Sequence, residues 1–304
     1  MLLFSSSSAF DRVRRRNRLR IPLGAHSRLV LFSDLHRGTG DWADDFLHNR
    51  LLFEAALEYY NRRRFTYIEI GDGDELVKNR GLEPLVQAYD RIFRLLDLFH
   101  RDGRLIYLFG NHNLRMKNAR WREKQLAEAR RHIPGLWTGL NVWESVLLGD
   151  KLLLFHGHQA DMLSTFLHPL NRLFIRFIWR FMQNGPGLIN PLSVSQNPKK
   201  RTRLEHKITA WARKRKIAAV TGHTHRPVFL SLDRPHFFNP GSGVHPRVVT
   251  ALEIVSRSIR LVKWRLASDA DDRGRVKVSR QVPEGCQTDL GKLFSSLGEE
   301  RPEA

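Results

Sequence analysis

The chain has 304 residues, 41% of them hydrophobic, which is enough for one large α/β domain with an insertion, or two small domains, around a sizeable core. Its net charge of +20 favours anionic partners, namely phosphorylated substrates, nucleic acid or an anionic membrane face, although a solvated basic surface would give the same total. Its single cysteine, Cys286, excludes an internal disulfide and a thiolate metal cluster, and it fits a reducing cytosol, so we expect a cytoplasmic protein.

Residues 1–27 are expected to form a basic, mobile arm. They are a poor secretory signal, because the positive charges between Arg12 and Arg20 follow the short apolar stretch instead of preceding it. The main domain would then span residues 28–266.

Strand and helix patterns alternate over the first part of this domain. Apolar runs at 28–33, 65–70 and 104–109 predict buried strands, and helical spacing predicts helices at 46–63 and 85–99. Strands that alternate with helices of this length indicate βαβ units and a mostly parallel sheet.

After a polar helix at 119–131, the predicted strands follow one another closely. Residues 141–148 and 151–155 predict a hairpin that turns at Gly149-Asp150. The later strands are expected at 217–221, 227–232, 235–238, 247–255 and 258–266. The close spacing of these strands favours a second, partly antiparallel sheet. Residues 267–304 are polar and charged, so they predict a weakly ordered tail.

An insertion at about 162–216 lies between the hairpin and the later strands. Residues 165–183 are largely apolar and aromatic, but arginines recur there every four residues and would share one helical stripe: Arg172, Arg176 and Arg180. These charges exclude a membrane span. The segment is either an amphipathic helix in peripheral contact with a membrane surface or an acyl chain, or a helix packed on the core with its arginines outward. The basic helix that follows, 199–216, either gathers anionic substrate or is a solvated face.

Five strand patterns end in Asp, Asn or His, and in open α/β sheets ligands bind at the carboxyl ends of the strands. The side chains at these junctions are therefore expected to meet at one site. The candidate metal ligands are Asp34, His36, Asp72, Asn111, His156, His223 and His225.

Imidazole, carboxylate and amide oxygen together suit Mn²⁺, Fe²⁺ or Zn²⁺ and not Ca²⁺. The candidate ligands exceed what one ion with an open water position needs, so two ions bridged by one carboxylate is the economical arrangement. In such sites the ions stand about 3.5–4 Å apart, acidify a bridging water and neutralise charge on a phosphoryl group. His112, beside a ligand but not needed as one, is left to donate a proton to the leaving oxygen.

The order and spacing of these residues resemble the five signature blocks of the calcineurin-like metallophosphoesterases, which here read Asp34-Leu-His36, Gly71-Asp72, Gly110-Asn111-His112, His156 and Gly222-His223-Thr-His225. The resemblance covers about residues 28–265, and Asn239-Pro-Gly-Ser242 is similar to a turn that often follows the last histidines. It implies a four-layer α/β/β/α sandwich of two mixed sheets, here with a helical cap insertion. It also implies a phosphoester hydrolase that depends on two divalent metal ions, foremost Mn²⁺.

The resemblance further implies a role for each residue. Asp34, His36 and His225 would hold the first ion, and Asn111, His156 and His223 the second. Asp72 would bridge the ions, and His112 would contact the phosphate and act as the acid. Many members have an acidic residue after the Asn-His pair, where this chain has Asn113, so we expect Asp74 or Asp44 to supply the missing charge.

Some features are similar to the UDP-2,3-diacylglucosamine pyrophosphatase branch. These are Glu75, three residues beyond Asp72, the Arg226-Pro227 pair, and an insertion where that branch carries an acyl-binding cap. His112 departs from the branch, which usually has arginine there. Candidate substrate contacts are Arg37, Asp74, Glu75, His158 and Arg226, and His158 is alternatively a hydrogen-bond donor to a ligand or a ligand itself.

The expected substrate is an anionic phosphoester or pyrophosphate, either lipid-linked or a nucleotide sugar. Two alternatives stay open. One is a protein phosphatase, phosphodiesterase or nuclease of the same superfamily. The other is a non-catalytic nucleic-acid-binding protein that grips phosphates with the basic arm and the basic helix.

Overall fold

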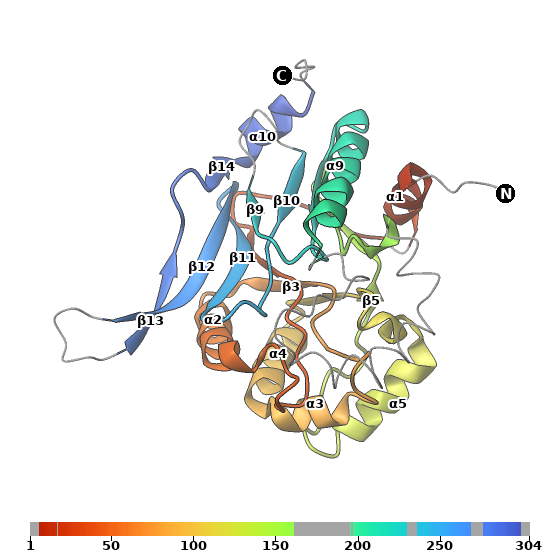
Figure 1. The fold of residues 1–304 in the computed structure, drawn as a ribbon, viewed down its shortest axis with the longest axis vertical. Helices are drawn as coiled ribbons and strands as arrows, with labels where there is room; N and C mark the ends of the chain where they lie inside the picture. The colour runs from red at the N-terminus through yellow and green to blue at the C-terminus, as the bar shows by residue number, and fades with distance from the viewer. Residues whose placement is uncertain are drawn as a thin grey trace.

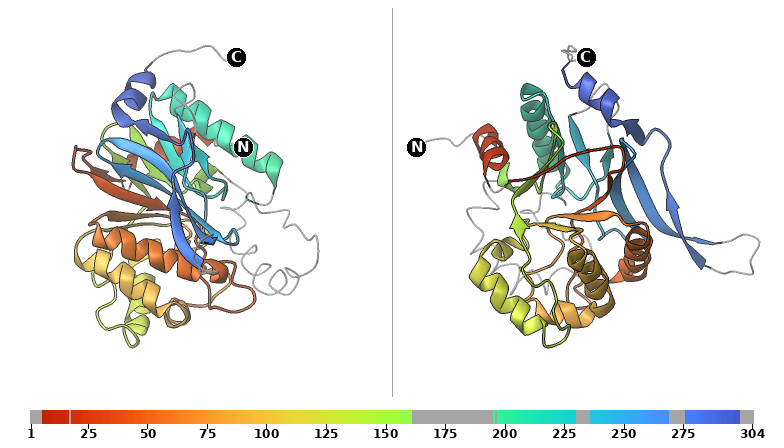
Figure 2. Two further views of the ribbon diagram at one scale, coloured as in Figure 1. Left: turned by 90° about the vertical axis from the view of Figure 1, so that its left-hand side faces the viewer. Right: turned by 180° about the vertical axis from the view of Figure 1, so that it is seen from behind.

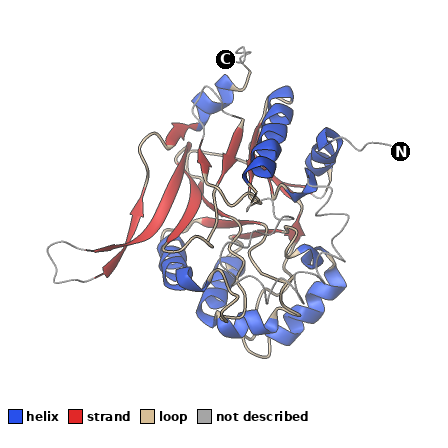
Figure 3. Cartoon of the chain, in the orientation of Figure 1, coloured by secondary structure: helices blue, strands red, loops and turns tan. Residues whose placement is uncertain are grey.

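The structure is a computed structural model that describes residues 6–16, 18–160, 195, 197–229, 236–268 and 276–298. Two mixed β-sheets pack face to face, and helices cover their outer faces (Figure 1). The strands lie between two groups of helices when the chain is coloured by secondary structure (Figure 3). The fold is therefore a mixed α/β sandwich, as the alternation of strand and helix patterns predicts.

The larger sheet has eight strands. Its centre is parallel, as predicted from the βαβ pattern, and antiparallel strands extend one side. The order is β13 (Val276–Gln281), β12 (Ser258–Ser268), β11 (Val248–Val255), β2 (Arg28–Phe32), β3 (Thr66–Ile70), β4 (Leu105–Leu108) and β5 (Val142–Trp143), and β14 (Gln287–Asp289) pairs with β12.

The smaller sheet has six strands and contains the predicted hairpin, which turns at Gly149-Asp150. The order is β1 (Arg18–Ile21), β6 (Ser145–Leu148), β7 (Leu152–Phe155), β8 (Ala218–Thr221), β10 (Phe237–Asn239) and β9 (Val228–Phe229). The sequence prediction is wrong about one part of this sheet, because β11 and β12 join the larger sheet instead.

The core between the sheets explains why the strand sequences are continuously apolar. Along β2, Leu29 and Leu31 face the other sheet, whereas Val30 and Phe32 face the helices. A strand buried on both faces needs apolar residues at every position, not an alternating pattern. The polar residues that follow such a strand are thus confined to its end.

One group of helices covers the larger sheet and packs against Phe32, Tyr67 and Tyr107. It consists of α2 (Arg50–Arg62), α3 (Glu83–Ala88), α4 (Asp90–Arg101) and α5 (Ala119–Ala129). The helix predicted at 85–99 is divided at Tyr89, where the backbone leaves the helical region. Short 3₁₀ turns lie at η1 (Leu47–Asn49), η2 (Leu114–Lys117) and η3 (His158–Ala160).

The other group covers the smaller sheet and consists of α1 (Ser6–Arg15) and α9 (Pro198–Lys214), which lie side by side in Figure 1 and in the right-hand view of Figure 2. The ring of Phe10 on α1 lies 5.3 Å from Trp211 on α9 and 5.7 Å from Phe155 on β7. The prediction of a mobile arm at residues 1–27 is wrong for the described part, because Phe10 and Val13 are buried and β1 pairs with β6.

The prediction of a weakly ordered tail at 267–304 is also wrong for its described residues. The strands β13 and β14 pair with β12, and α10 (Leu290–Ser296) buries Leu290 and Leu293 against the core between the sheets. Of the insertion, α9 confirms the basic helix, whereas residues 165–183 lie outside the described residues. No helix in the described part of the chain is both long and apolar enough to cross a bilayer.

Candidate metal centre

The strand-end residues meet where the two sheets come together. The loops that follow β2, β3 and β4 in the larger sheet face those that follow β7 and β8 in the smaller one. Each loop brings one or two of the seven candidate ligands listed above. The prediction that these side chains converge is confirmed.

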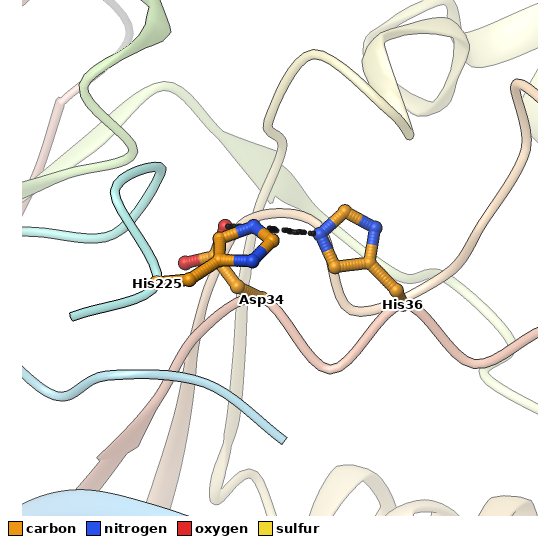
Figure 4. A group of neighbouring side chains, drawn as sticks. All are labelled: Asp34, His36 and His225. Atoms are coloured by element: carbon orange, nitrogen blue, oxygen red, sulfur yellow. Dashed lines mark hydrogen bonds and ion pairs between the residues drawn. The ribbon is translucent and has the colours of Figure 1, made fainter. Parts of the chain in front are cut away.

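The first group of possible ligands is Asp34, His36 and His225 (Figure 4). The Nε2 atoms of His36 and His225 are 3.1 Å apart. Oδ1 of Asp34 lies 3.2 Å from Nε2 of His225 and 3.9 Å from Nε2 of His36. Three donor atoms at these separations can bind a single cation.

The second group is Asp72, His156 and His223, whose ligand atoms all lie within 4.8 Å of one another. Nε2 of His156 is 3.1 Å from Oδ2 of Asp72 and 3.2 Å from Oδ1 of Asn111. Asp72 also forms a possible ligand group with His36 and His112. Its carboxylate therefore lies between the two groups, where a bridging ligand would have to be.

The protonation of His156 gives a test of whether a cation fits. Its Nδ1 lies 2.9 Å from the carbonyl oxygen of Ile70, which can only accept, so Nδ1 carries a hydrogen and Nε2 points at the oxygens of Asp72 and Asn111. Burial alone would lower the pKa of His156, but Asp72 and Asp34 raise it to about 9. The two carboxylates thus stabilise a positive charge at Nε2 of His156. A bound metal ion can take the place of the proton that Nε2 would otherwise carry.

The carboxylates are held ionised. Burial alone would raise the pKa of Asp34, but His225 and His156 lower it to about 2. The pKa of Asp72 is lowered well below its usual value by His156 and His112 despite the same burial. The site therefore gathers buried negative charge and imidazole lone pairs, which suits borderline divalent ions.

The backbone at the site is locally strained. Five of the predicted ligands have positive φ angles, between 51° and 68°: Asp34, His36, Asp72, His223 and His225. Such values are uncommon outside glycine, and each costs about 1–3 kcal/mol. Residues held in this way by the surrounding fold are preorganised for ligand binding.

The second carboxylate oxygen of Asp34 is fixed by its neighbours. It accepts hydrogen bonds from Oγ of Ser33 at 2.6 Å and from the backbone N–H of His223 at 2.9 Å. Gly222 permits this contact, because a Cβ there would lie 2.4 Å from the same oxygen. Sequence reasoning missed Ser33, whose position as the last residue of the strand pattern was the only available signal.

Glu75 is the acidic residue that orients His112. Its Oε2 accepts from Nδ1 of His112 at 2.7 Å and from Nδ1 of His36 at 3.1 Å. The prediction that Asp74 or Asp44 plays this part is wrong. Asp44 instead accepts hydrogen bonds from Tyr89 and from backbone N–H groups of its own loop.

Two of the predicted substrate contacts, Arg37 and Asp74, are wrong, because both side chains are completely buried. Nε of Arg37 donates to Asp74 at 2.9 Å, and its Nη2 donates to Glu69 at 3.0 Å. Neither side chain presents a group to a substrate. Glu75, also buried, contacts the two histidines and the backbone N–H groups of Val77 and Lys78.

The other two predicted contacts lie close to the site. The buried ring of His158 has its centre 5.4 Å from that of His156, and burial lowers its pKa well below the usual value. Arg226 follows His225, is exposed, and forms an ion pair with Glu205 of α9.

No protein-family model matches this chain, and no curated protein matches its sequence.

Proposed function

We propose that this protein is a phosphoester hydrolase of the calcineurin-like metallophosphoesterase type that depends on two divalent metal ions, Mn²⁺ foremost. The observation that carries the proposal is the position of Asp72 between two groups of possible ligands. One carboxylate shared by two ligand groups suits a pair of ions about 3.5–4 Å apart.

The residues would divide as follows: Asp34, His36 and His225 hold one ion, Asn111, His156 and His223 hold the other, and Asp72 contacts both. The ions, when bound, supply activation of a water molecule and neutralisation of charge on the phosphoryl group. The hydrogen bonds of His36 to Glu75 and of His156 to Ile70 keep each Nε2 directed at the site.

His112 acts as the general acid in this proposal. Burial would lower its pKa, but Glu75 and Asp72 raise it to about 9. Its Nδ1 hydrogen is held by Glu75, and its backbone N–H donates to Oδ1 of Asp72 at 2.8 Å. This fixes the ring beside the bridging carboxylate, with Nε2 left to give a proton to the leaving oxygen.

The substrate is anionic in this proposal, and the basic surface of α9 supports that class. Exposed lysine and arginine side chains extend along the helix at Lys199, Lys200, Arg203, Lys207, Arg213 and Lys214. The ion pair of Glu205 with Arg226 joins the helix to the loop that carries His225. A positive surface next to a catalytic centre raises the local concentration of an anionic substrate.

Hydrolysis by metal-stripped protein with and without added Mn²⁺, Fe²⁺ or Zn²⁺ tests the proposal. The panel should contain a monoester, a diester, a nucleoside-diphosphate sugar and its diacylated form, with and without detergent micelles. Turnover of at least one substrate that depends on metal is expected. Absence of turnover from the whole panel in protein that retains two metal ions would contradict the proposed activity.

The panel also separates the substrate classes. Preference for the acylated pyrophosphate would establish a lipid-linked substrate and peripheral action at the membrane. The basic surface of α9 also favours a second candidate, a phosphodiesterase or nuclease, which would prefer the diester and be inhibited competitively by oligonucleotides.

A further inference from the structure

A chain of buried polar side chains joins three of the loops that carry ligands. Arg37 follows β2, Asp74 follows β3, Tyr107 lies on β4, and Asn113 follows β4. All four are buried, so none of them contacts a substrate from solvent. Their partners are instead one another.

The first link joins the loops after β2 and β3. Arg37 donates from Nε to Oδ1 of Asp74 at 2.9 Å and from Nη2 to Glu69 at 3.0 Å. A guanidinium group does not lose its proton, and a buried charge is tolerated only when paired. The two loops therefore cannot separate without leaving the Arg37 charge unpaired inside the protein.

The backbone of the same two loops is joined in register. Arg37 and Asp74 form an isolated parallel β-bridge, in which the N–H of Arg37 donates to the carbonyl of Gly73 at 2.9 Å. One residue earlier, the N–H of His36 donates to the carbonyl of Asp72 at 2.9 Å. The link thus lies directly beside one ligand of the first group and the shared carboxylate.

The second link reaches the loop after β4. The hydroxyl of Tyr107 donates to Oδ2 of Asp74 at 2.6 Å and accepts from Nδ2 of Asn113 at 2.8 Å. Oδ1 of Asn113 accepts from the backbone N–H of Gly110 at 2.6 Å, which closes the turn containing Asn111 and His112. The position after the Asn-His pair, which is acidic in many members of the resembled family, therefore serves here as a neutral bridge to Tyr107.

Gly73 leaves space for this chain of buried side chains. A Cβ at this position would lie 2.6 Å from Nη2 of Arg37 and 2.5 Å from Cδ of Glu69. Only glycine lets the ion pair form against the backbone that connects Asp72 to Asp74. The sequence around the shared carboxylate is thus adapted to the buried chain as well as to the site.

We propose that Arg37, Asp74, Tyr107 and Asn113 are positioning residues that hold the loops after β2, β3 and β4 at the separation that metal binding requires. The part that concerns metal affinity rests on the proposed function. The part that concerns the positions of the loops does not, because the contacts exist without any ion.

Two tyrosines provide a matched test. Tyr107 and Tyr60 are both buried, and each hydroxyl donates to a carboxylate and accepts one hydrogen bond. Tyr60, however, donates to Glu253 on β11 at 2.7 Å and accepts from Trp264 on β12 at 3.1 Å, so its hydroxyl joins no ligand loop. Tyr107→Phe and Tyr60→Phe therefore remove the same group from similar surroundings. Amide hydrogen exchange of the metal-free proteins, and Mn²⁺ affinity by calorimetry, are the two measurements.

Tyr107→Phe should increase amide exchange in residues 110–114 and weaken Mn²⁺ binding by about 10-fold or more, the usual effect of removing a group that supports a ligand. Tyr60→Phe should change neither quantity by more than about 2-fold. Equal effects of the two changes, a larger effect of Tyr60→Phe, or no effect of Tyr107→Phe would overturn the proposal.

A double variant tests whether the residues act as one chain. If Asn113 acts through Tyr107, adding Asn113→Ser to Tyr107→Phe should increase exchange no further than the larger of the two single changes. Additive effects would contradict a single chain. If the wild-type protein binds no metal ion, the proposed function fails, whereas the exchange measurements still decide the positioning of the loops.

Discussion

Buried Glu75 and half-buried His112 form a carboxylate–imidazole pair, with Oε2 of Glu75 2.7 Å from Nδ1 of His112. The pKa of Glu75 is held well below its usual value by His112, although burial opposes this, so the pair carries charge on both partners. Because the same oxygen also accepts from His36 at 3.1 Å, one carboxylate orients both the proposed acid and a proposed metal ligand. The two roles can be separated by mutation.

His112→Ala should slow substrates with poor leaving groups, such as phenyl esters, by about 100-fold or more, and p-nitrophenyl esters much less, because a good leaving group needs no proton. Rates at saturating Mn²⁺ on the two esters measure this. Equal losses on both would make His112 a binding or structural residue.

Glu75→Gln should reproduce this selective loss and also weaken metal binding, because a neutral amide oxygen is a weaker acceptor for Nδ1 of His112 and His36. The double variant of Glu75→Gln with His112→Ala should bind metal more weakly than His112→Ala alone. Its rates on the two esters at saturating Mn²⁺ should equal those of His112→Ala. Unchanged metal affinity in Glu75→Gln would show that the contact with His36 is dispensable.

Asp72→Asn should lower turnover by at least about 100-fold while leaving the thermal unfolding temperature of the metal-free protein within a few degrees of wild type. The reason is that an amide is a poor bridge between two cations. Asp150→Asn, an exposed carboxylate in the turn between β6 and β7, is the matched control and should be fully active. Near-normal turnover of Asp72→Asn with metal supplied would exclude the bridging role.

Glu253 should make the stability of the larger sheet depend on pH. It is buried on β11 and accepts from Tyr60, Arg260 of β12 and Arg280 of β13, each at 2.7 Å. Burial raises its pKa, but Arg280 outweighs this, so the pKa is lower in the folded than in the unfolded protein. The stabilisation is therefore present above the unfolded value and is lost as the pH falls through the folded value.

The test is Glu253→Gln, which should lower the free energy of unfolding in urea by about 2 kcal/mol at pH 7, because hydrogen bonds to a charged group are lost. The difference from wild type should shrink steadily below pH 4. A difference that is constant with pH would mean that the charge of Glu253 contributes nothing.

The sequence predicts where a site residue lies relative to a strand better than it predicts the direction in which its side chain points. The position of Asp34 or His156 follows from the end of an apolar run, because each lies just after a buried strand, β2 of the larger sheet or β7 of the smaller one. The direction of Arg37 and Asp74 does not, because a polar residue after a strand can turn toward solvent or toward a buried partner. Arg37 turns inward because Glu69, a charged residue inside an apolar strand pattern, accepts a hydrogen bond from its guanidinium group.

The same limit explains the errors at the two termini. The arginines around Phe10 and Val13 favour a solvated arm, yet this apolar pair, one helical turn apart, anchors α1. Val276–Gln281 has too few apolar residues to predict a core strand, but an edge strand needs only its backbone partner, β12.

The central claim is that two metal ions flank Asp72. Anomalous diffraction from crystals grown with Mn²⁺ tests it most directly, because it locates each ion without reference to activity. The account predicts two peaks about 3.5–4 Å apart, one beside Asp34, His36 and His225 and the other beside Asn111, His156 and His223. No peak between the sheets, or a single ion that does not touch Asp72, would contradict it.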